Sequence, residues 1–218
     1  IKGIDVSAYQ GNIDWKTVAD YGMGFAILRI TEKGNVIDST FERNYKGCTK
    51  NNIPVGVYKY SYAMSVAEAQ KEAEKVVDVL DGRKLDFPVW LDLEHPDQRN
   101  LSKSTLETMI KTFWSVVKAA GYKFGIYSNV DWYENIIPES TKPKYDFWIA
   151  RYPANDDGWL QERLRPSYGV GWQYSSKAKI PGIDGYVDRD VFYKDYKEES
   201  DSVSYTKSDA INRVIDIA

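Results

Sequence analysis

The chain has 218 residues, 43% of them hydrophobic, and a formal net charge of −3. This length fits one large domain, such as an α/β barrel of roughly 200–250 residues. The small net charge argues against broad electrostatic binding to nucleic acid or other polyanions. Cys48 is the single cysteine, so no internal disulfide can form and a buried, inert thiol is expected.

The aromatic content, with 7 Trp and 17 Tyr, indicates a surface that stacks on flat or ring-shaped ligands. No apolar run approaches the ~20 residues that a membrane span requires. The chain begins directly with the strand-like IKGIDVS, which does not have the pattern of a signal peptide.

Eight short apolar segments are predicted to be strands, at residues 3–7, 24–31, 54–62, 87–94, 123–129, 145–152, 168–175 and 185–192. Helical patterns are expected between the first five of them, at residues 14–21, 38–51, 65–82 and 104–121. Beyond residue 128 the connections contain Pro and Gly and carry weak helix signals. Alternation of strands and helices predicts a parallel sheet with right-handed crossovers. We therefore expect a barrel whose later part is irregular.

The C-terminal residues differ in composition from the rest. Residues 194–201, KDYKEESD, are a charged break, and residues 208–218 begin a capped amphipathic pattern that then stops. We interpret residues 1–193 as the barrel, 194–207 as a linker and 208–218 as the first helix of a truncated second domain. The alternative is a C-terminal helix that docks on the barrel.

The stretch FPVWLDLEHP at residues 87–96 places two carboxylates in an apolar strand. Asp92 and Glu94 are two residues apart, so they share one face of that strand, where mutual repulsion and lost hydration cost free energy. Chemistry in a parallel barrel gathers at the C-terminal strand ends. Asp5 in the first strand and Asp188, with Asp190, in the last are expected at the same mouth, because the first and last strands are neighbours.

Aromatic residues at matching strand ends are expected to line this mouth: Tyr60, Tyr62, Tyr127, Trp148, Trp172 and Tyr174. Acids ringed by aromatics suit the cleavage of glycosidic bonds. One acid must stay protonated to give its proton to the leaving oxygen, another must stabilise the positive charge at the anomeric carbon, and the rings carry the sugars. Proximity of like charges raises the pKa of one acid in such a group.

At these residues the chain resembles glycoside hydrolase family 25. The segments that carry the resemblance occur in family order between residues 3 and 193: GIDVSAYQGNIDW (3–15), PVWLDLE (88–94), GIYSN (125–129), FWIARY (147–152), WQYSS (172–176) and GYVDRDVF (185–192). The resemblance implies a flattened (β/α)5(β)3 barrel of the TIM type. It also implies a lysozyme of the endolysin or autolysin type that cleaves the β-1,4 bond from N-acetylmuramic acid to N-acetylglucosamine.

The resemblance also implies roles for the four acids. Glu94 matches the general acid/base, and Asp92 matches the carboxylate that orients the 2-acetamido group of the substrate, whose own carbonyl oxygen acts as nucleophile with retention. Asp5 and Asp188 match the two remaining acids, although Asp184 and Asp190 lie close to the latter. The family pattern departs at LRITEKG (28–34), where Arg29 and Lys33 leave the role of the loop open.

Other interpretations stay open at this point. A catalytically silent sugar-binding barrel and a chitin-cleaving enzyme fit the same residues. A metal site would need His95, the only histidine, which follows Glu94 and points to the opposite strand face. We expect no cofactor, peptidoglycan glycan strands as the partner, action as a monomer, and a location outside the cell or at the cell wall, by secretion or by phage lysis.

Overall fold

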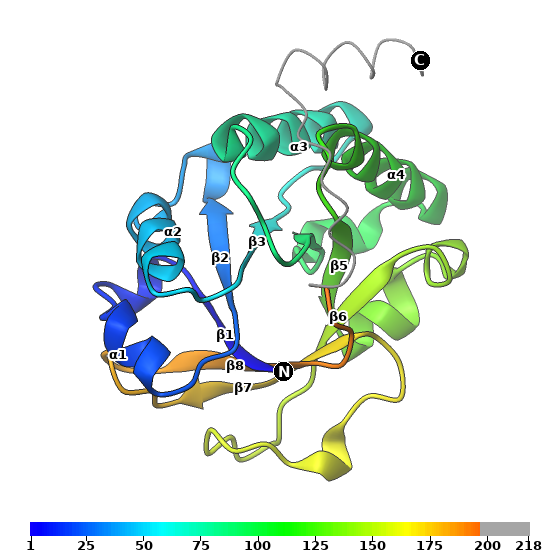
Figure 1. Cartoon of the computed structure of the whole chain (residues 1–218). Helices are drawn as coiled ribbons and strands as arrows, with labels where there is room; N and C mark the ends of the chain where they lie inside the picture. Colours follow the sequence, from blue (N-terminus) through cyan, green and yellow to red (C-terminus); the bar gives the residue numbers. More distant parts are fainter. Residues whose placement is uncertain (197–218) are drawn as a thin grey trace.

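A computed structural model describes residues 1–196 as a closed barrel of eight strands (Figure 1). Each strand pairs with the next in sequence, and the last returns to the first. The strands are β1 (Lys2–Val6), β2 (Ala26–Thr31), β3 (Val55–Tyr60), β4 (Val89–Asp92), β5 (Phe124–Asn129), β6 (Asp146–Ala150), β7 (Gly171–Ala178) and β8 (Val187–Phe192). All eight predicted strands are present, and the predicted α/β barrel of the TIM type is confirmed.

Four α-helices connect the first five strands: α1 (Trp15–Asp20), α2 (Phe41–Lys50), α3 (Val66–Leu80) and α4 (Lys103–Ala119). Figure 1 shows them on the outside of the barrel, alongside the blue-to-green strands. Asp14 caps α1, because its carboxylate accepts from the backbone amides of Lys16 and Thr17. The connections beyond β5 hold only short turns: the π-helix Trp132–Ile136 and the 3-10 helices Glu139–Thr141 and Glu162–Leu164.

The direction of β8 differs from the all-parallel expectation. Strands β1 to β7 run parallel, whereas β8 is antiparallel to both of its neighbours, β7 and β1. The connection from β7 to β8 spans only residues 179–186, which is too short for the crossover that parallel strands need. The amino end of β8 therefore lies at the same mouth as the carboxyl ends of β1 to β7.

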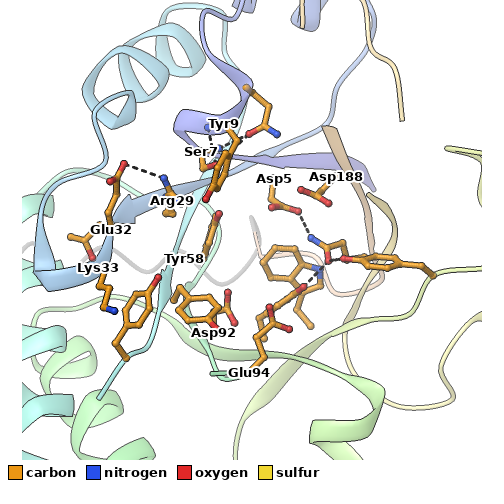
Figure 2. Close-up of a pocket in the computed structure, with 18 residues that line it drawn as sticks. Asp5, Ser7, Tyr9, Arg29, Glu32, Lys33, Tyr58, Asp92, Glu94 and Asp188 are labelled. Carbon is orange, nitrogen blue, oxygen red and sulfur yellow. Dashed lines mark hydrogen bonds and ion pairs between the residues drawn. The ribbon is translucent and has the colours of Figure 1, made fainter. Parts of the chain in front are cut away.

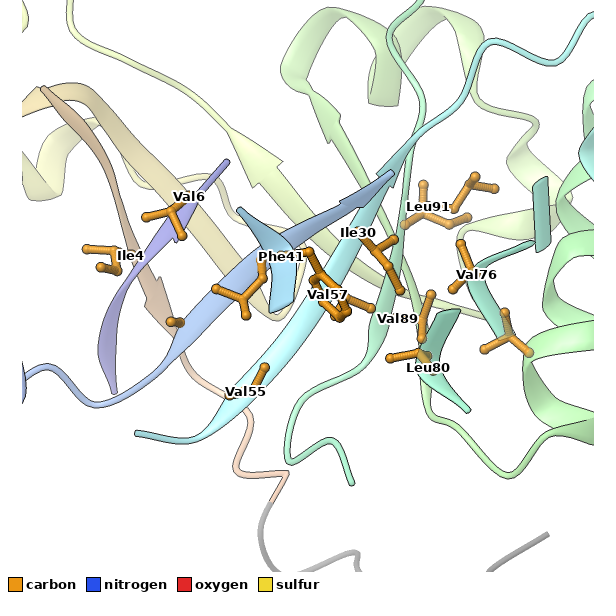
Figure 3. Close-up of a cluster of buried hydrophobic side chains, with 14 of the residues drawn as sticks. Ile4, Val6, Ile30, Phe41, Val55, Val57, Val76, Leu80, Val89 and Leu91 are labelled. Carbon is orange, nitrogen blue, oxygen red and sulfur yellow. The ribbon is translucent and has the colours of Figure 1, made fainter. Parts of the chain in front are cut away.

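Alternation along the strands separates two apolar layers. One layer packs between the strands and the helices, and Figure 3 shows part of it: Ile4, Val6, Ile30, Phe41, Val55, Val57, Val76, Leu80, Val89 and Leu91. The other fills the barrel interior with large aromatic side chains, among them Trp90, Trp148 and Phe192. Gly125 makes room for this filling, because a Cβ there would lie 2.2 Å from the Trp90 ring.

The barrel continues past the predicted boundary at residue 193. Tyr196 is 1% exposed and packs in the interior aromatic layer, and its hydroxyl donates to Asp146 Oδ2 at 2.9 Å. Residues 194–196 thus pack against the barrel. The rest of the predicted linker and the predicted helix 208–218 lie outside the described residues. Among residues 1–196, no helix is both long and apolar enough to cross a membrane.

Candidate active site

A cavity of about 520 Å³ opens at the carboxyl ends of the parallel strands. Its walls come from β1 to β8 and from the loops that follow them. The lining residues labelled in Figure 2 are Asp5, Ser7, Tyr9, Arg29, Glu32, Lys33, Tyr58, Asp92, Glu94 and Asp188. All four acids predicted from the sequence therefore face one cavity.

The strand register explains how the acids meet. Asp5 and Asp188 are directly paired across the antiparallel β1–β8 contact. Asp92 is the last residue of β4 and is paired with Tyr60, the last residue of β3. Glu94 follows two residues later on the same face, as the alternation predicts.

Asp92, at the end of β4, lies deeper than Glu94, two residues beyond it. Asp92 is 4% exposed, and its Oδ1 has no hydrogen-bond partner among residues 1–196. Glu94 is only half-buried and accepts a long hydrogen bond of 3.4 Å from Asn129 Nδ2. The reason is position: Asp92 belongs to the strand, whereas Glu94 lies on the loop that leaves it.

Burial raises the pKa of Asp5, Asp92, Glu94 and Asp188, and like charges raise that of the three aspartates further. For Asp92, burial is the largest cause, followed by the charges of Glu94 and Asp5, and the pKa lies well above its usual value. Burial also raises the pKa of Glu94, against the opposing hydrogen bond from Asn129. The pKa of Asp188 is raised to about 7, by burial and then by the charge of Asp156. The cluster therefore holds protons at a pH at which isolated carboxyls would be ionised.

The structure distinguishes the three acids near the last strand. Asp188 lines the cavity, Asp184 is exposed, and Asp190 is fully buried behind Asp5. Trp148 Nε1 donates to Asp190 Oδ1 at 3.1 Å. Burial raises the pKa of Asp190 well above its usual value, and the charges of Asp5 and Asp188 raise it further.

Gln173 of β7 is a site residue that the sequence reasoning missed. Its Nε2 donates to Asp5 Oδ2 at 2.6 Å, and its Oε1 accepts from the hydroxyls of Tyr127, at 2.7 Å, and Tyr152. These bonds hold the amide in one orientation, with its donor toward the acids. The sequence does hint at this role. In the strand WQYSS (172–176) side chains alternate between two faces, so either Gln173 or its two neighbours must point into the barrel.

Four of the six predicted aromatic residues line the cavity: Tyr60, Tyr62, Tyr127 and Trp148. The rings of Tyr60 and Tyr62 lie 4.8 Å apart at the rim, whereas Tyr127 and Trp148 contact each other in the buried floor. Tyr62 and Tyr60 are only partly buried, so their rings are the ones able to meet a ligand.

Trp172 and Tyr174 do not line this cavity, which corrects their predicted placement. They are buried on the outer face of β7, where they pack with Val191, Leu160 and Leu164. The indole Nε1 of Trp172 donates to the carbonyl oxygen of Arg151 at 2.9 Å. The cause is the alternation of β7, in which Gln173 occupies the inward face that the prediction gave to its two neighbours.

The LRITEKG segment forms one wall of the cavity. Arg29 Nε bonds Asp38 Oδ2 at 2.7 Å, and Arg29 Nη2 bonds Glu32 Oε1 at 3.1 Å. Its guanidinium carbon also lies 5.2 Å from the centre of the Tyr9 ring. Lys33 extends beside Tyr62, with Nζ 5.8 Å from the ring centre. Arg29 is thus held in place by two carboxylates, while Lys33 is exposed at the rim.

Lys59 is a buried lysine whose charge acts on the acid cluster. Lys59 Nζ lies 3.6 Å from Glu72 Oε1, and the Lys59 side chain is 0% exposed. Glu72 also accepts from the hydroxyl of Ser61 at 2.7 Å and from the backbone amide of Tyr62 at 2.8 Å. The positive charge of Lys59 acts on Asp92 and lowers its pKa, in opposition to burial. The network therefore fixes the backbone that carries Tyr62 and places a cation near the acids.

His95 contacts the rings of Tyr60 and Tyr62, at centroid distances of 6.0 and 5.3 Å. Within the part of the chain that the structure describes, no group of three or more His, Cys, Asp and Glu side chains has an arrangement able to hold a metal ion.

Comparison with known proteins agrees with this geometry. Residues 4–183 match the family model of the glycosyl hydrolases family 25. The chain is 33% identical over 202 residues to the uncharacterized protein YegX of Escherichia coli K12, covering 88% of this chain and 69% of that protein. It is 29% identical over 206 residues to lysozyme M1 of Streptomyces globisporus, covering 88% and 67%. The crystal structure of the bacterial lysozyme from Streptomyces coelicolor superposes with a TM-score of 0.71 at 26% identity, covering 97% of each chain.

The chain therefore belongs to glycosyl hydrolases family 25. The resemblance seen in the sequence is confirmed, and so is the enzyme class, a glycoside hydrolase of the lysozyme type.

Proposed function

We propose that this enzyme hydrolyses the glycan strands of peptidoglycan at the β-1,4 bond between N-acetylmuramic acid and N-acetylglucosamine. The proposal rests above all on one observation: Asp92 and Glu94 share the inward face at the end of β4, in a cavity that also holds Asp5 and Asp188. The names of relatives such as lysozyme M1 support the choice of substrate and action at the cell wall.

In the proposed first step, Glu94 gives its proton to the glycosidic oxygen as the bond to the anomeric carbon breaks. The carbonyl oxygen of the substrate's 2-acetamido group attacks the same carbon and forms a cyclic oxazolinium ion. Asp92 accepts a hydrogen bond from the acetamido N–H and offsets the positive charge. Burial raises the pKa of Glu94, which favours the protonated form that this step needs.

In the second step a water molecule attacks the anomeric carbon, gives its proton back to Glu94, and opens the ring with net retention. Asp92 must be ionised when the positive charge develops, yet its pKa is raised well above the usual value by burial. Its proton must therefore pass to solvent before the bond breaks. Lys59 favours this loss, because its charge lowers the pKa of Asp92.

Asp5 and Asp188 have a supporting role in this scheme. They border the reacting pair, and Gln173 fixes the orientation of Asp5 through its 2.6 Å hydrogen bond. Tyr60 and Tyr62, at the rim, are the proposed sugar platforms.

The rival function is a sugar-binding barrel without catalysis. A binder gains nothing from several buried acids with raised pKa values, whereas an acid–base catalyst needs them. Release of reducing ends from purified cell walls separates the two: hydrolysis produces a steady increase, and a silent binder produces none. Chitin oligomers offered in parallel test the alternative substrate.

A further inference from the structure

The outer face of β7 and β8 carries a second cavity, of about 640 Å³. Helices cover the outside of the barrel between β1 and β5, but within residues 1–196 no α-helix follows β6 or β7 (Figure 1). The loop 151–170 packs there and leaves a groove, which we call the β7–β8 groove. Its lining includes Tyr21, Trp159, Tyr174, Lys177, Tyr186 and Arg189.

Exposed aromatic rings gather in the β7–β8 groove. Trp159 is 73% exposed, Tyr186 54% and Tyr21 50%. Such large apolar surfaces lose free energy in water, and a cluster of them marks a surface that meets a ligand. Flat rings exposed on one side are suited to stacking against the apolar faces of sugars.

The groove is also basic, although the whole chain has a net charge of −3. Lys2, Lys177 and Lys179 are exposed and have no ion pair within the described residues. Arg189 Nε is buried without a hydrogen-bond partner in the same part of the chain. The two acids of the lining, Asp156 and Asp157, instead accept hydrogen bonds from residues of their own loop and of β7. With four cations (Lys2, Lys177, Lys179 and Arg189) against these two carboxylates, the lining of the groove has a net positive charge.

The groove lies next to the catalytic cavity but shares no lining residue with it. Gln10, in the wall of the catalytic cavity, donates from Nε2 to the carbonyl oxygen of Tyr186 at 3.3 Å. Asp156 of the groove is close enough to Asp188 for its charge to act on that carboxyl. A polymer that passes along the groove therefore comes close to the catalytic mouth.

We propose that the β7–β8 groove is a second binding site for a peptidoglycan glycan strand, separate from the catalytic cavity. Sugar rings stack on Trp159 and Tyr186, and the carboxylates of the lactyl groups and stem peptides pair with Lys177, Lys179 and Arg189. The site holds the enzyme on the insoluble wall while the catalytic cavity acts on a neighbouring strand. The choice of ligand rests on the proposed function.

The test compares insoluble and short substrates. Trp159→Ala and the double variant Lys177→Ala/Lys179→Ala are measured on purified sacculi and on a soluble tetrasaccharide, for which attachment to the insoluble wall has no part. Tyr193→Ala and Lys71→Ala are matched controls, because both residues are exposed and lie outside both cavities. Each groove variant is expected to lose about three- to tenfold in sacculus hydrolysis and to keep full activity on the tetrasaccharide.

Binding without turnover is measured by sedimenting the protein with sacculi, in variants that also carry Glu94→Gln. The groove variants are expected to stay in the supernatant at protein concentrations where the parent sediments, and added salt should release the parent. Unchanged binding and sacculus hydrolysis in both groove variants would overturn the proposal, as would an equal loss on the tetrasaccharide. Binding that disappears when phosphate polymers are stripped from the wall would also overturn it, in favour of a phosphate ligand. If neither the parent nor any variant cleaves the tetrasaccharide or the sacculi, the proposed function is wrong. The sedimentation experiment still shows whether the groove binds the wall.

Discussion

Asp5 and Asp188 face each other across the antiparallel β1–β8 pair, at the seam where the barrel closes. Directly opposed like charges destabilise a sheet, and burial adds to the cost. The protein reduces that cost by holding protons: the pKa of Asp188 is raised to about 7, and that of Asp5 lies well above its usual value. The site is thus a source of instability that grows as the pH rises.

The first prediction concerns the stability of Asp188→Asn. Between about pH 4 and 7 the folded protein holds a proton on Asp188 that the unfolded chain has lost, so stability falls as pH rises through this window. Asparagine cannot ionise and should remove this loss. We expect the variant to be more stable than the parent at pH 8, by on the order of 2 kcal/mol, and nearly equal to it at pH 4. Urea unfolding at the two pH values measures the difference.

The exposed Asp184 offers the control for this experiment. Asp184→Asn should leave the stability at both pH values within ~0.5 kcal/mol of the parent. An Asp188→Asn variant that is destabilised at pH 8 would show that the ionised carboxylate is stabilising in the fold.

A second prediction separates catalysis from binding at Glu94. Glu94→Gln keeps the shape of the side chain but removes the proton donor, so kcat should fall by ~10²–10⁴ while substrate still binds. Steady-state kinetics with a binding measurement on a soluble glycan give both values. Loss of binding equal to the loss of turnover would argue against the role of Glu94 as the acid.

Lys59 provides a prediction about pH dependence. Its charge lowers the pKa of Asp92, so Lys59→Met should raise that pKa and shift the acid limb of kcat/KM to higher pH. Lys59→Arg keeps the charge and serves as the control, with a smaller shift. The pH–rate profiles of the three forms are the measurement, and an acid limb that does not move in Lys59→Met would mean that Asp92 does not need to ionise.

The stereochemistry of the product tests the role given to Asp92. Attack by the substrate's own carbonyl oxygen followed by water predicts that the first-formed sugar is the β anomer, and proton NMR during the first minutes of digestion detects it. An initial α anomer would mean direct attack by water from the opposite side. Asp92→Asn should also lose turnover, because the amide does not offset the developing positive charge.

Much of the fold and the acid cluster was predictable because both depend on local periodicity. The spacing of Asp92 and Glu94 fixes their shared face, and the apolar segments give all eight strands. The direction of β8 was predictable from the shortness of residues 179–186, a signal that the strand–helix alternation obscured.

The remaining site residues depend on choices that periodicity leaves open. In WQYSS either Gln173 or the pair Trp172 and Tyr174 can face inward, and only the closed barrel decides. Likewise, Arg29 reaches the cavity wall through its contact with Asp38, which comes from a different segment. The greater depth of Asp92 over Glu94 follows from where β4 ends, and strand ends are poorly defined by sequence.

The most direct test of the account identifies the bond that is cut. Purified peptidoglycan is digested with the enzyme, the new reducing ends are reduced with borohydride, and the muropeptides are analysed by mass spectrometry. Cleavage at the proposed bond predicts that every new reducing end is a reduced N-acetylmuramic acid. New ends that carry reduced N-acetylglucosamine, or an absence of new reducing ends with the glycan still bound, would contradict the proposed function.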